Sequence, residues 1–376
     1  MNKVLVFKSQ DDKDPRVPLL PEEARKLCQL GCKVWVAAGL GSSLGISNED
    51  YEAEGCDITS APTEVLDEID IVLSLGPPSP DMAAAYKAHH VHIGSLNAFQ
   101  NGDQVREWQD RGFTTIALDF IPRTTIAQKM DVLSSQANLV GYSAVIVACY
   151  NLNKLAPMMM TPSGTIQPAR FFILGAGVAG LQAIATARRL GARVDAYDPR
   201  PDVEEQVKSL GARFIQIKLG ETGQTKDGYA KALKSDQIRE QQIAMAEYCA
   251  SSDVVITTAQ VFGKKAPKLI TREMIERMPH GSVIVDGAVE SGGNVEGSIA
   301  DGLVKVHGVT IIGYRNLACR VAHDASQMHS NNLVNFLSHF WVPDSQAFAF
   351  NPADEIIQAS MVTHQGNIVS HRLNLH

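Results

Sequence analysis

The sequence of 376 residues predicts an α/β protein built from two doubly wound domains that are joined by long helices. Two runs of short β patterns alternate with helical patterns, which indicates βαβ units and mainly parallel sheets. Between the runs, Ser134–Leu155 is long, apolar and free of proline, so we expect a connecting helix there. Asp324–Phe340 is expected to be a second helix that returns the chain to the first domain. The length fits two domains at about 100–200 residues each.

The first run covers the first 120 residues. Pro21 with Glu22 and Glu23 in the first turn is typical of a helix start. The expected helices are Pro21–Leu30 and Asn97–Arg111, and the expected strands are Lys3–Phe7, Lys33–Ala37, Asp70–Leu75, His90–Gly94 and Phe113–Asp119.

The second run begins at Arg170. Its expected strands are Phe171–Leu174, Arg193–Tyr197, Arg213–Gln216, Asp253–Thr257, Ser282–Asp286 and Val309–Ile312. Gly220–Gly228 is a polar, glycine-rich loop before a helical Tyr229–Ala250, and either a lid or a solvated insertion fits it. We expect domains at residues 1–133 with 319–376 and at residues 134–318.

A dinucleotide-binding fingerprint opens the second run. A buried strand leads into Gly175-Ala-Gly177-Val178-Ala-Gly180, and a helix follows. The glycines permit a tight turn, a close approach to a pyrophosphate and tight packing of the helix on the sheet. The helix start offers unpaired N–H groups to phosphates. Asp198 ends the next strand, where a carboxylate accepts ribose hydroxyls, so the sequence predicts a Rossmann-like domain with a nucleotide cleft between the two lobes.

Bulk properties restrict the partners. A net charge of −7 argues against nucleic acid or an anionic membrane surface. No run of 18 apolar residues predicts a membrane span. The six scattered cysteines form no C-x-x-C motif and indicate reduced thiols in a cytoplasm.

A polar loop precedes the connecting helix. Arg123, Gln128, Asp131 and Ser134 offer a guanidinium, an amide, a carboxylate and a hydroxyl just after a strand end, where open α/β sheets bind ligands. A nicotinamide and its ribose need such groups. The structural alternative is that Asp131 and Ser134 cap the helix.

This loop resembles the signature loop of the NAD(H)-binding component of proton-translocating nicotinamide nucleotide transhydrogenases. The matching pattern is Pro-Arg-x5-Gln-x2-Asp-x2-Ser-Ser-Gln-x-Asn-x2-Gly-Tyr, and the similarity covers nearly the whole chain. It includes Met158–Thr161, Gly175–Leu190, Gly228–Lys231, Ile256–Ala259, Pro267–Thr271 and Val289–Asn294.

The resemblance implies roles for particular residues. Arg123, Gln128 and Asp131 would orient the nicotinamide and its ribose, and would be catalytic in that sense, because hydride transfer between two nicotinamides needs positioning rather than an acid or base. Gly228 and Tyr229 would form the tip of a mobile loop. The full set of implied NAD(H) contacts is Arg123, Thr124, Gln128, Asp131, Ser134, Gly175, Gly177, Val178, Gly180, Asp198, Pro199, Arg200, Gly228, Tyr229, Thr258, Ala259 and Gln260.

The resemblance also implies partners. It predicts a homodimer that works with an NADP(H)-binding domain and membrane proton-channel subunits, as a cytoplasmic component peripheral to the inner membrane. The expected activity is Re/Si-specific, proton-translocating NAD(P) transhydrogenation, active only with those partners. No metal is expected.

Two rival functions remain open. An alanine dehydrogenase resembles this chain in its opening Arg16-Val-Pro-Leu-Leu-Pro-Glu22, but such enzymes carry a lysine in a Lys-Glu-Pro context, where this chain has Leu75-Gly76-Pro77. They also carry an acid/base histidine where this chain has Asn97. A non-catalytic NAD-binding regulator is the second rival. Asp198 would repel a 2′-phosphate, which favours NAD over NADP.

Three further patterns are interpreted as structural. His89-His90-x-His92 is expected at a surface or sheet edge rather than on a metal, since it has no ligand partners at suitable spacing. Gly39–Gly45 is expected to be a plain loop. Met158–Met160 is expected to serve packing.

Overall fold

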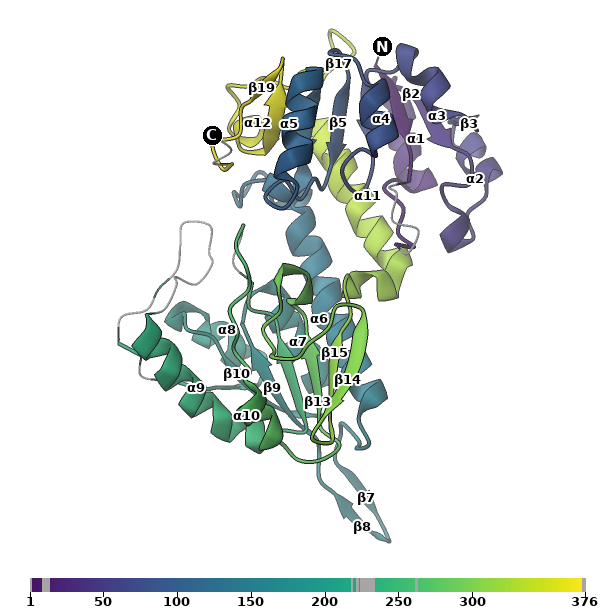
Figure 1. The fold of residues 1–376 in the computed structure, drawn as a ribbon. Helices are drawn as coiled ribbons and strands as arrows, with labels where there is room; N and C mark the ends of the chain where they lie inside the picture. Colours follow the sequence, from purple (N-terminus) through teal and green to yellow (C-terminus); the bar gives the residue numbers. More distant parts are fainter. Residues whose placement is uncertain are drawn as a thin grey trace. The chain divides into compact units, whose positions relative to one another are not determined.

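The computed structural model describes residues 2–8, 14–217, 219–220, 223, 234–260 and 263–373. The chain forms two compact units, drawn in Figure 1. Unit 1 comprises Met1–Gln136 with Val321–His376, and unit 2 comprises Ala137–Arg320.

Unit 1 contains an eight-stranded sheet in the order β19-β18-β6-β5-β4-β1-β2-β3. Its first six strands pair in parallel, and the two C-terminal strands are antiparallel. The strand order reverses beside β1, which pairs with both β2 and β4. The strands are β1 (Lys3–Val6), β2 (Lys33–Ala37), β3 (Asp57–Thr59), β4 (Ile71–Leu73), β5 (Val91–Gly94), β6 (Thr114–Ala117), β18 (Met361–His364) and β19 (Asn367–Ile368).

Helices complete unit 1 and bury one face of this sheet. The core unites apolar residues of α1, α11 and α12 with the central strands. The helices are α1 (Pro21–Gln29), α2 (Asn48–Ala53), α3 (Pro62–Val65), α4 (Pro80–Ala85), α5 (Gly102–Arg111), α11 (Ala322–His339) and α12 (Glu355–Ser360); β16 (Trp341–Val342) and β17 (Ala347–Phe348) form a small hairpin.

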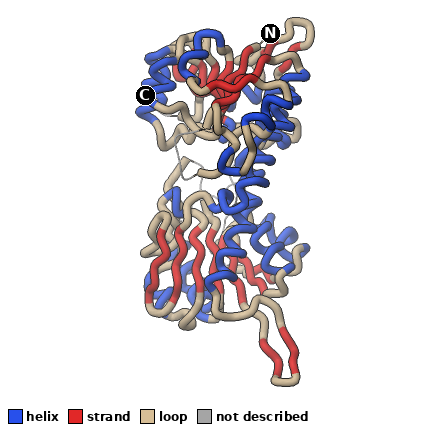
Figure 2. The backbone as a smooth tube through the Cα atoms, turned by 90° about the vertical axis from the view of Figure 1, so that its right-hand side faces the viewer, coloured by secondary structure: helices blue, strands red, loops and turns tan. Residues whose placement is uncertain are grey.

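Unit 2 contains a seven-stranded sheet in the order β11-β10-β9-β12-β13-β15-β14, visible side by side in Figure 2. All pairs are parallel except β14–β15. The first unit-2 strand of this sheet, β9, pairs with both β10 and β12, so the strand order reverses there as in dinucleotide-binding sheets. The strands are β9 (Arg170–Leu174), β10 (Arg193–Tyr197), β11 (Arg213–Phe214), β12 (Val254–Thr257), β13 (Val283–Asp286), β14 (Gly302–Val306) and β15 (Val309–Gly313).

Two apolar clusters cover the faces of the unit 2 sheet. One gathers α7 (Val178–Arg189) and α8 (Glu204–Ser209), and the other gathers α9 (Ser235–Ala250) and α10 (Arg272–Glu276). A hairpin of β7 (Met159–Thr161) and β8 (Gly164–Ile166) extends beyond the sheet (Figure 2).

Helix α6 (Val132–Asn151) connects the two units along the chain. Among the described residues it is one helix long and apolar enough to cross a membrane by length and composition. That is weak evidence, because 44% of its apolar window is buried inside the protein, as in many core helices.

The α/β fold class predicted from the sequence is confirmed, and two interpretations are wrong. His90 and His92 are fully buried in β5 or beside it, and β5 is an internal strand rather than a sheet edge. Met158, Met159 and Met160 do not pack into a core but are 42–74% exposed. The expected loop at Gly39–Gly45 contains only a short 3-10 turn, Ser42–Leu44. The expected loop Gly220–Gly228 and the start of the following helix lie largely outside the described residues.

Candidate functional site

The glycine turn after β9 has the geometry that its sequence predicts. Gly175 adopts φ +98°, a left-handed conformation that favours glycine. A Cβ at Gly180 would overlap the carbonyl oxygen of Gly175, so α7 approaches the turn more closely than any other residue would allow. A Cβ at Gly177 would meet nothing within 4 Å. The turn is therefore closed at its first and third glycines and open at its second.

The open side of the turn is the start of α7. Gly177 is the N-cap residue, and it has no side chain to cap the helix. Val178 is the first helical residue and is partly exposed. The unpaired N–H groups and the positive dipole end of a 12-residue helix are therefore directed at open space, which suits a phosphate group.

Asp198 follows β10 and ties this turn to the neighbouring strand. Its Oδ2 accepts a hydrogen bond from the Ala176 N–H at 2.8 Å, although its side chain is almost fully buried. Arg200 contacts both carboxylate oxygens, through Nε at 2.8 Å and Nη2 at 2.7 Å, and its backbone N–H donates at 2.9 Å. These bonds raise the pKa of the Arg200 guanidinium. Pro199 lies between the two residues and is partly exposed. With four donors on two oxygens, a ribose hydroxyl could reach Asp198 only if the guanidinium moved aside.

The segment after β12 completes the carboxyl edge of the unit 2 sheet. Thr258 donates from its backbone to the Leu174 carbonyl at 2.8 Å, and its side chain contacts the Gly175 carbonyl at 3.3 Å. Ala259 exchanges hydrogen bonds with the Asn294 amide, at 3.1 Å and 2.8 Å. Gln260 is exposed and donates to the Gly287 carbonyl. The predicted residues of unit 2 therefore meet at the carboxyl ends of β9, β10 and β12.

Sequence reasoning missed two buried polar residues that hold this edge. Asp286, at the end of β13, is fully buried and accepts from the N–H groups of Ala288, Asn294 and Val295. Asn294 is also fully buried. The signal was present in the sequence, since an acid at a strand end followed by two glycines and an asparagine is typical of a tightly hydrogen-bonded loop. The predicted Gly228 and Tyr229 lie outside the described residues.

The polar loop of unit 1 leads from the end of β6 into α6. Asp131 accepts from the Ser134 N–H at 2.9 Å and from the Ser134 hydroxyl at 2.6 Å, and it is 8% exposed. The capping alternative raised from the sequence is thus present in the structure. Capping holds the carboxylate at a fixed place and leaves acceptor capacity on its oxygens.

The remaining predicted residues of this loop precede the cap. Arg123 and Gln128 are exposed, and Thr124 is partly exposed and accepts backbone hydrogen bonds from Ala127 and Gln128, at 3.1 Å each. These bonds fold the segment into a compact turn. The loop therefore brings Arg123, Thr124, Gln128, Asp131 and Ser134 together on one continuous segment of unit 1.

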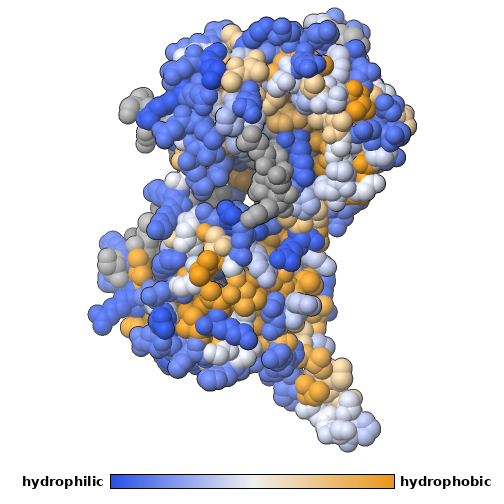
Figure 3. Space-filling view, turned by 45° about the vertical axis from the view of Figure 1, so that its right-hand side comes forward, coloured by the Kyte–Doolittle hydropathy of each residue, from blue (hydrophilic) through white to orange (hydrophobic). Residues whose placement is uncertain are grey.

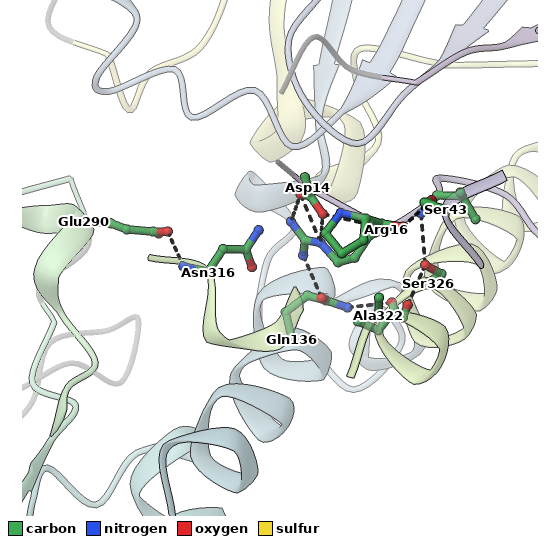
Figure 4. Close-up of polar contacts among 11 residues, drawn as sticks. Asp14, Arg16, Ser43, Gln136, Glu290, Asn316, Ala322 and Ser326 are labelled. Atoms are coloured by element: carbon green, nitrogen blue, oxygen red, sulfur yellow. Dashed lines mark hydrogen bonds and ion pairs between the residues drawn. The ribbon is translucent and has the colours of Figure 1, made fainter. Parts of the chain in front are cut away.

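A buried ion pair supports the start of α6, and the sequence did not reveal it. Figure 4 shows Arg16 between Asp14 and Gln136. Its guanidinium contacts Asp14 through Nε at 3.0 Å and Nη2 at 2.7 Å, while Nη1 donates to Gln136 Oε1 at 2.8 Å. Gln136 in turn donates to the Ala325 carbonyl at 3.0 Å. Arg16 thus joins the N-terminal segment to the first turns of α6 and α11.

The loops after β4 and β5 are packed against each other. A Cβ at Gly94 would come within 2.7 Å of the Gly76 carbonyl oxygen. Asp119 accepts from the N–H groups of Leu96 and Asn97, at 2.8 Å and 3.0 Å, and burial raises the pKa of this carboxyl. The Asn97 side chain donates to Gln100.

His92 is the nearest histidine to these loops and is enclosed. Its Nδ1 lies 3.0 Å from the Tyr86 hydroxyl and its Nε2 3.1 Å from the Gly76 carbonyl oxygen. A neutral ring that donates from Nε2 and accepts at Nδ1 satisfies both contacts. Burial lowers the pKa of His92 to about 4, so the ring is neutral at pH 7.

Comparison with known proteins identifies related chains. The family model for the alanine dehydrogenase/PNT N-terminal domain matches residues 6–140, and that for the C-terminal domain matches residues 144–371. The first part of the NAD(P) transhydrogenase subunit alpha of Rickettsia prowazekii (strain Madrid E), a separate chain, is 43% identical, over 98% of this chain and 96% of its own. The crystal structure of transhydrogenase from Sinorhizobium meliloti superposes with a TM-score of 0.85 at 40% identity, covering 99% of this chain and all of that one. The alanine dehydrogenase of Halomonas elongata is 28% identical over 89% of this chain and 86% of its own.

The glycine turn yields a matched pair of substitutions. We expect Gly177→Ala to fold like the unmodified protein, because its Cβ would enter open space, but to weaken NADH binding about tenfold or more, because that space is where a phosphate would approach. Gly180→Ala should lower the free energy of unfolding by about 3 kcal/mol or more, because its Cβ overlaps backbone. Thermal melts and fluorescence titrations with NADH measure both. Unchanged NADH affinity in a folded Gly177→Ala protein would contradict the assignment of the turn.

Proposed function

The chain belongs to the alanine dehydrogenase/PNT family, and we propose that within it the chain is the NAD(H)-binding component of a transhydrogenase. In this role it passes hydride between NADH and NADP⁺ that is held on a separate protein domain. Two features support the proposal: full-length similarity to a transhydrogenase subunit, and a fully formed glycine turn at the strand-order reversal of unit 2.

The residues of unit 2 fit an NAD molecule. The α7 start would take the pyrophosphate, with Gly177 allowing close approach. Asp198 and Arg200 would take the adenosine ribose, and the negative charge of Asp198 disfavours a 2′-phosphate at that place. Pro199 and Thr258–Gln260 border the same edge of the sheet and would contact the cofactor beside the turn. Gly228 and Tyr229 remain proposed contacts by the resemblance alone.

The polar loop of unit 1 would position the nicotinamide. When bound, the nicotinamide ring supplies or accepts the hydride. Asp131 is held by its two bonds to Ser134, so its remaining acceptor sites are fixed in direction for a ribose hydroxyl. Gln128 presents an exposed amide for the carboxamide group, and Arg123 and Thr124 lie on the same segment. None of these groups needs to exchange a proton, because hydride transfer between two nicotinamides releases none.

An amino-acid dehydrogenase is the rival function, and the loops after β4 and β5 disfavour it. Oxidation of an amino acid needs an anchor for its carboxylate and an acceptor for its proton. In this chain Leu75–Pro77 and Asn97 occupy the places where alanine dehydrogenases carry those groups. His92 cannot substitute as the proton acceptor, because it is enclosed by Ser74, Tyr86 and Gly76.

The partners belong to the same proposal. The similar Rickettsia protein is named as one part of a subunit, which favours an assembly with further subunits. We propose that these supply an NADP(H)-binding domain and a membrane proton channel, that the chain is active only with them, and that it works at the cytoplasmic side of the membrane. Proton translocation and Re/Si specificity are proposed by the same resemblance.

A homodimer is proposed, and the β7–β8 hairpin is its best candidate surface. Met158, Met159, Met160 and Ile166 are 42–74% exposed along the hairpin and the residue before it. Figure 3 shows hydrophobic residues gathered on this projection, with more polar ones at its tip. A thin hairpin with apolar side chains on its surface is stable only when another surface covers it.

Mixing the chain with an NADP(H)-binding transhydrogenase component tests the function. We expect NADH-dependent reduction of a bound NADP⁺ analogue, measured by absorbance, well above the rate of either component alone. A rate at the single-component background would overturn the proposal. Alanine-dependent reduction of NAD⁺ by the purified chain would instead identify an amino-acid dehydrogenase, and NADH binding with neither activity would identify a regulator.

Gln128→Ala separates orientation from binding in the same assay. Because Gln128 would orient the ring rather than supply most of the affinity, we expect the rate of hydride transfer to fall about tenfold while the Kd for NADH changes about twofold or less. Gln358→Ala, which removes an exposed amide on α12, is the control. Equal losses of rate and affinity in Gln128→Ala would exclude an orienting role.

Met160→Asp tests the homodimer. A carboxylate at this 74% exposed position should convert the dimer to a monomer, because a buried unpaired charge strongly disfavours an apolar interface. Light scattering after size-exclusion chromatography measures the mass. Ile299→Asp, at another exposed position of unit 2, is the control and should leave the dimer intact. A dimer that survives Met160→Asp would place the interface elsewhere.

A further inference from the structure

Four arginines gather at the amino edge of the unit 2 sheet, the opposite edge from the glycine turn. Arg170, Arg193 and Arg213 are the first residues of β9, β10 and β11, and parallel strands bring their amino ends to one edge. With Arg188, at the end of α7, they line a hollow of about 300 Å³. The glycine turn and its residues do not contribute to this hollow.

The backbone register places two of these charges directly beside each other. Arg170 is the register partner of Arg193, so their Cα atoms lie about 4.8 Å apart and their side chains leave the same face of the sheet. Like charges directly opposite each other on neighbouring strands are destabilising. Within the described residues neither side chain pairs with a carboxylate, so the protein itself does not offset this repulsion.

The other two arginines are held in place around the hollow. Arg213 contacts Asp195 through Nε at 2.8 Å and Nη2 at 2.7 Å. Arg188 donates to the Ala192 carbonyl at 3.2 Å, and its guanidinium lies against Gly211, where a Cβ would approach Nε to 3.3 Å. Four guanidinium groups thus line the hollow together with one carboxylate, in a chain whose net charge is −7.

We propose that this hollow, defined by Arg170, Arg188, Arg193 and Arg213, binds a phosphate-bearing anion. Guanidinium groups match the geometry of phosphate oxygens and bind them in pairs of hydrogen bonds. An anion between Arg170 and Arg193 would remove the repulsion that their register imposes. The volume suits a group of the size of a diphosphate or a lipid headgroup, and the site is distinct from the proposed NAD site.

The test uses inorganic pyrophosphate as the probe, with NADH saturating so that the glycine turn is not available to it. Calorimetry at low ionic strength should detect binding to the unmodified protein that weakens as salt rises. R170Q/R193Q should weaken it at least tenfold. The control R106Q/R272Q removes two exposed arginines that pair with Asp103 and Glu276, and so makes the same change in net charge elsewhere. It should leave the affinity within about twofold.

Thermal melts keep the comparison interpretable, because both double variants change only exposed side chains and should melt like the unmodified protein. Absence of pyrophosphate binding to the unmodified protein, or an equal loss in the control, would overturn the proposal. Sedimentation with vesicles of phosphatidylcholine containing phosphatidylglycerol distinguishes the sources. Vesicle binding that R170Q/R193Q abolishes identifies a lipid headgroup, whereas pyrophosphate binding without vesicle binding identifies a free anion.

Discussion

The close approach of α7 to the end of β9 is the constraint on which the candidate site depends. Gly180 packs so tightly on the Gly175 carbonyl that no side chain fits, and this contact fixes where the first turn of α7 begins. The N–H groups of that turn are then directed along the sheet edge rather than into the core. The Asp198 carboxylate secures the arrangement from the neighbouring strand through its bond to Ala176. A phosphate site results from packing, with hardly any polar side chain of its own.

The two acidic residues of the candidate site serve the fold as well as the proposed ligand. Asp131 caps α6, and Asp198 holds both the glycine turn and Arg200. Capping and ligand binding are therefore not exclusive, because a carboxylate has two oxygens and about four acceptor positions. The two cases differ in consequence. Asp131 keeps acceptor capacity beside its cap, whereas Asp198 is fully engaged by Arg200 and exchanges one partner for another when it accepts a hydroxyl.

Local patterns predicted the sheets well because buried parallel strands are short apolar runs with clear ends. Lys33–Ala37 and Arg193–Tyr197 match β2 and β10 at both ends, and the glycine fingerprint lies where its spacing predicts. Exposed strands escaped this reasoning. The β7–β8 hairpin has no buried face to impose alternation, and β14 covers an edge of the sheet with alternating exposed residues. His90 and His92 were misjudged because their polarity suggested a surface, whereas backbone carbonyls and the Tyr86 hydroxyl satisfy them inside the core.

Contacts between distant segments explain the rest of what the sequence could not predict. Arg16 and Gln136 are 120 positions apart, and no local pattern links them. Their bond nevertheless matters to the polar loop, because Gln136 lies one turn beyond Asp131 and Ser134 on α6. A reaction that moves only a hydride depends on where its groups are held rather than on proton transfer, so rigidity is the property that the surrounding residues must supply. The buried Asp14–Arg16 pair, the Asp131–Ser134 cap and the Asp286 loop all supply it by engaging backbone or fixed side chains. This explains why most polar groups near the proposed site are already hydrogen-bonded in the protein alone.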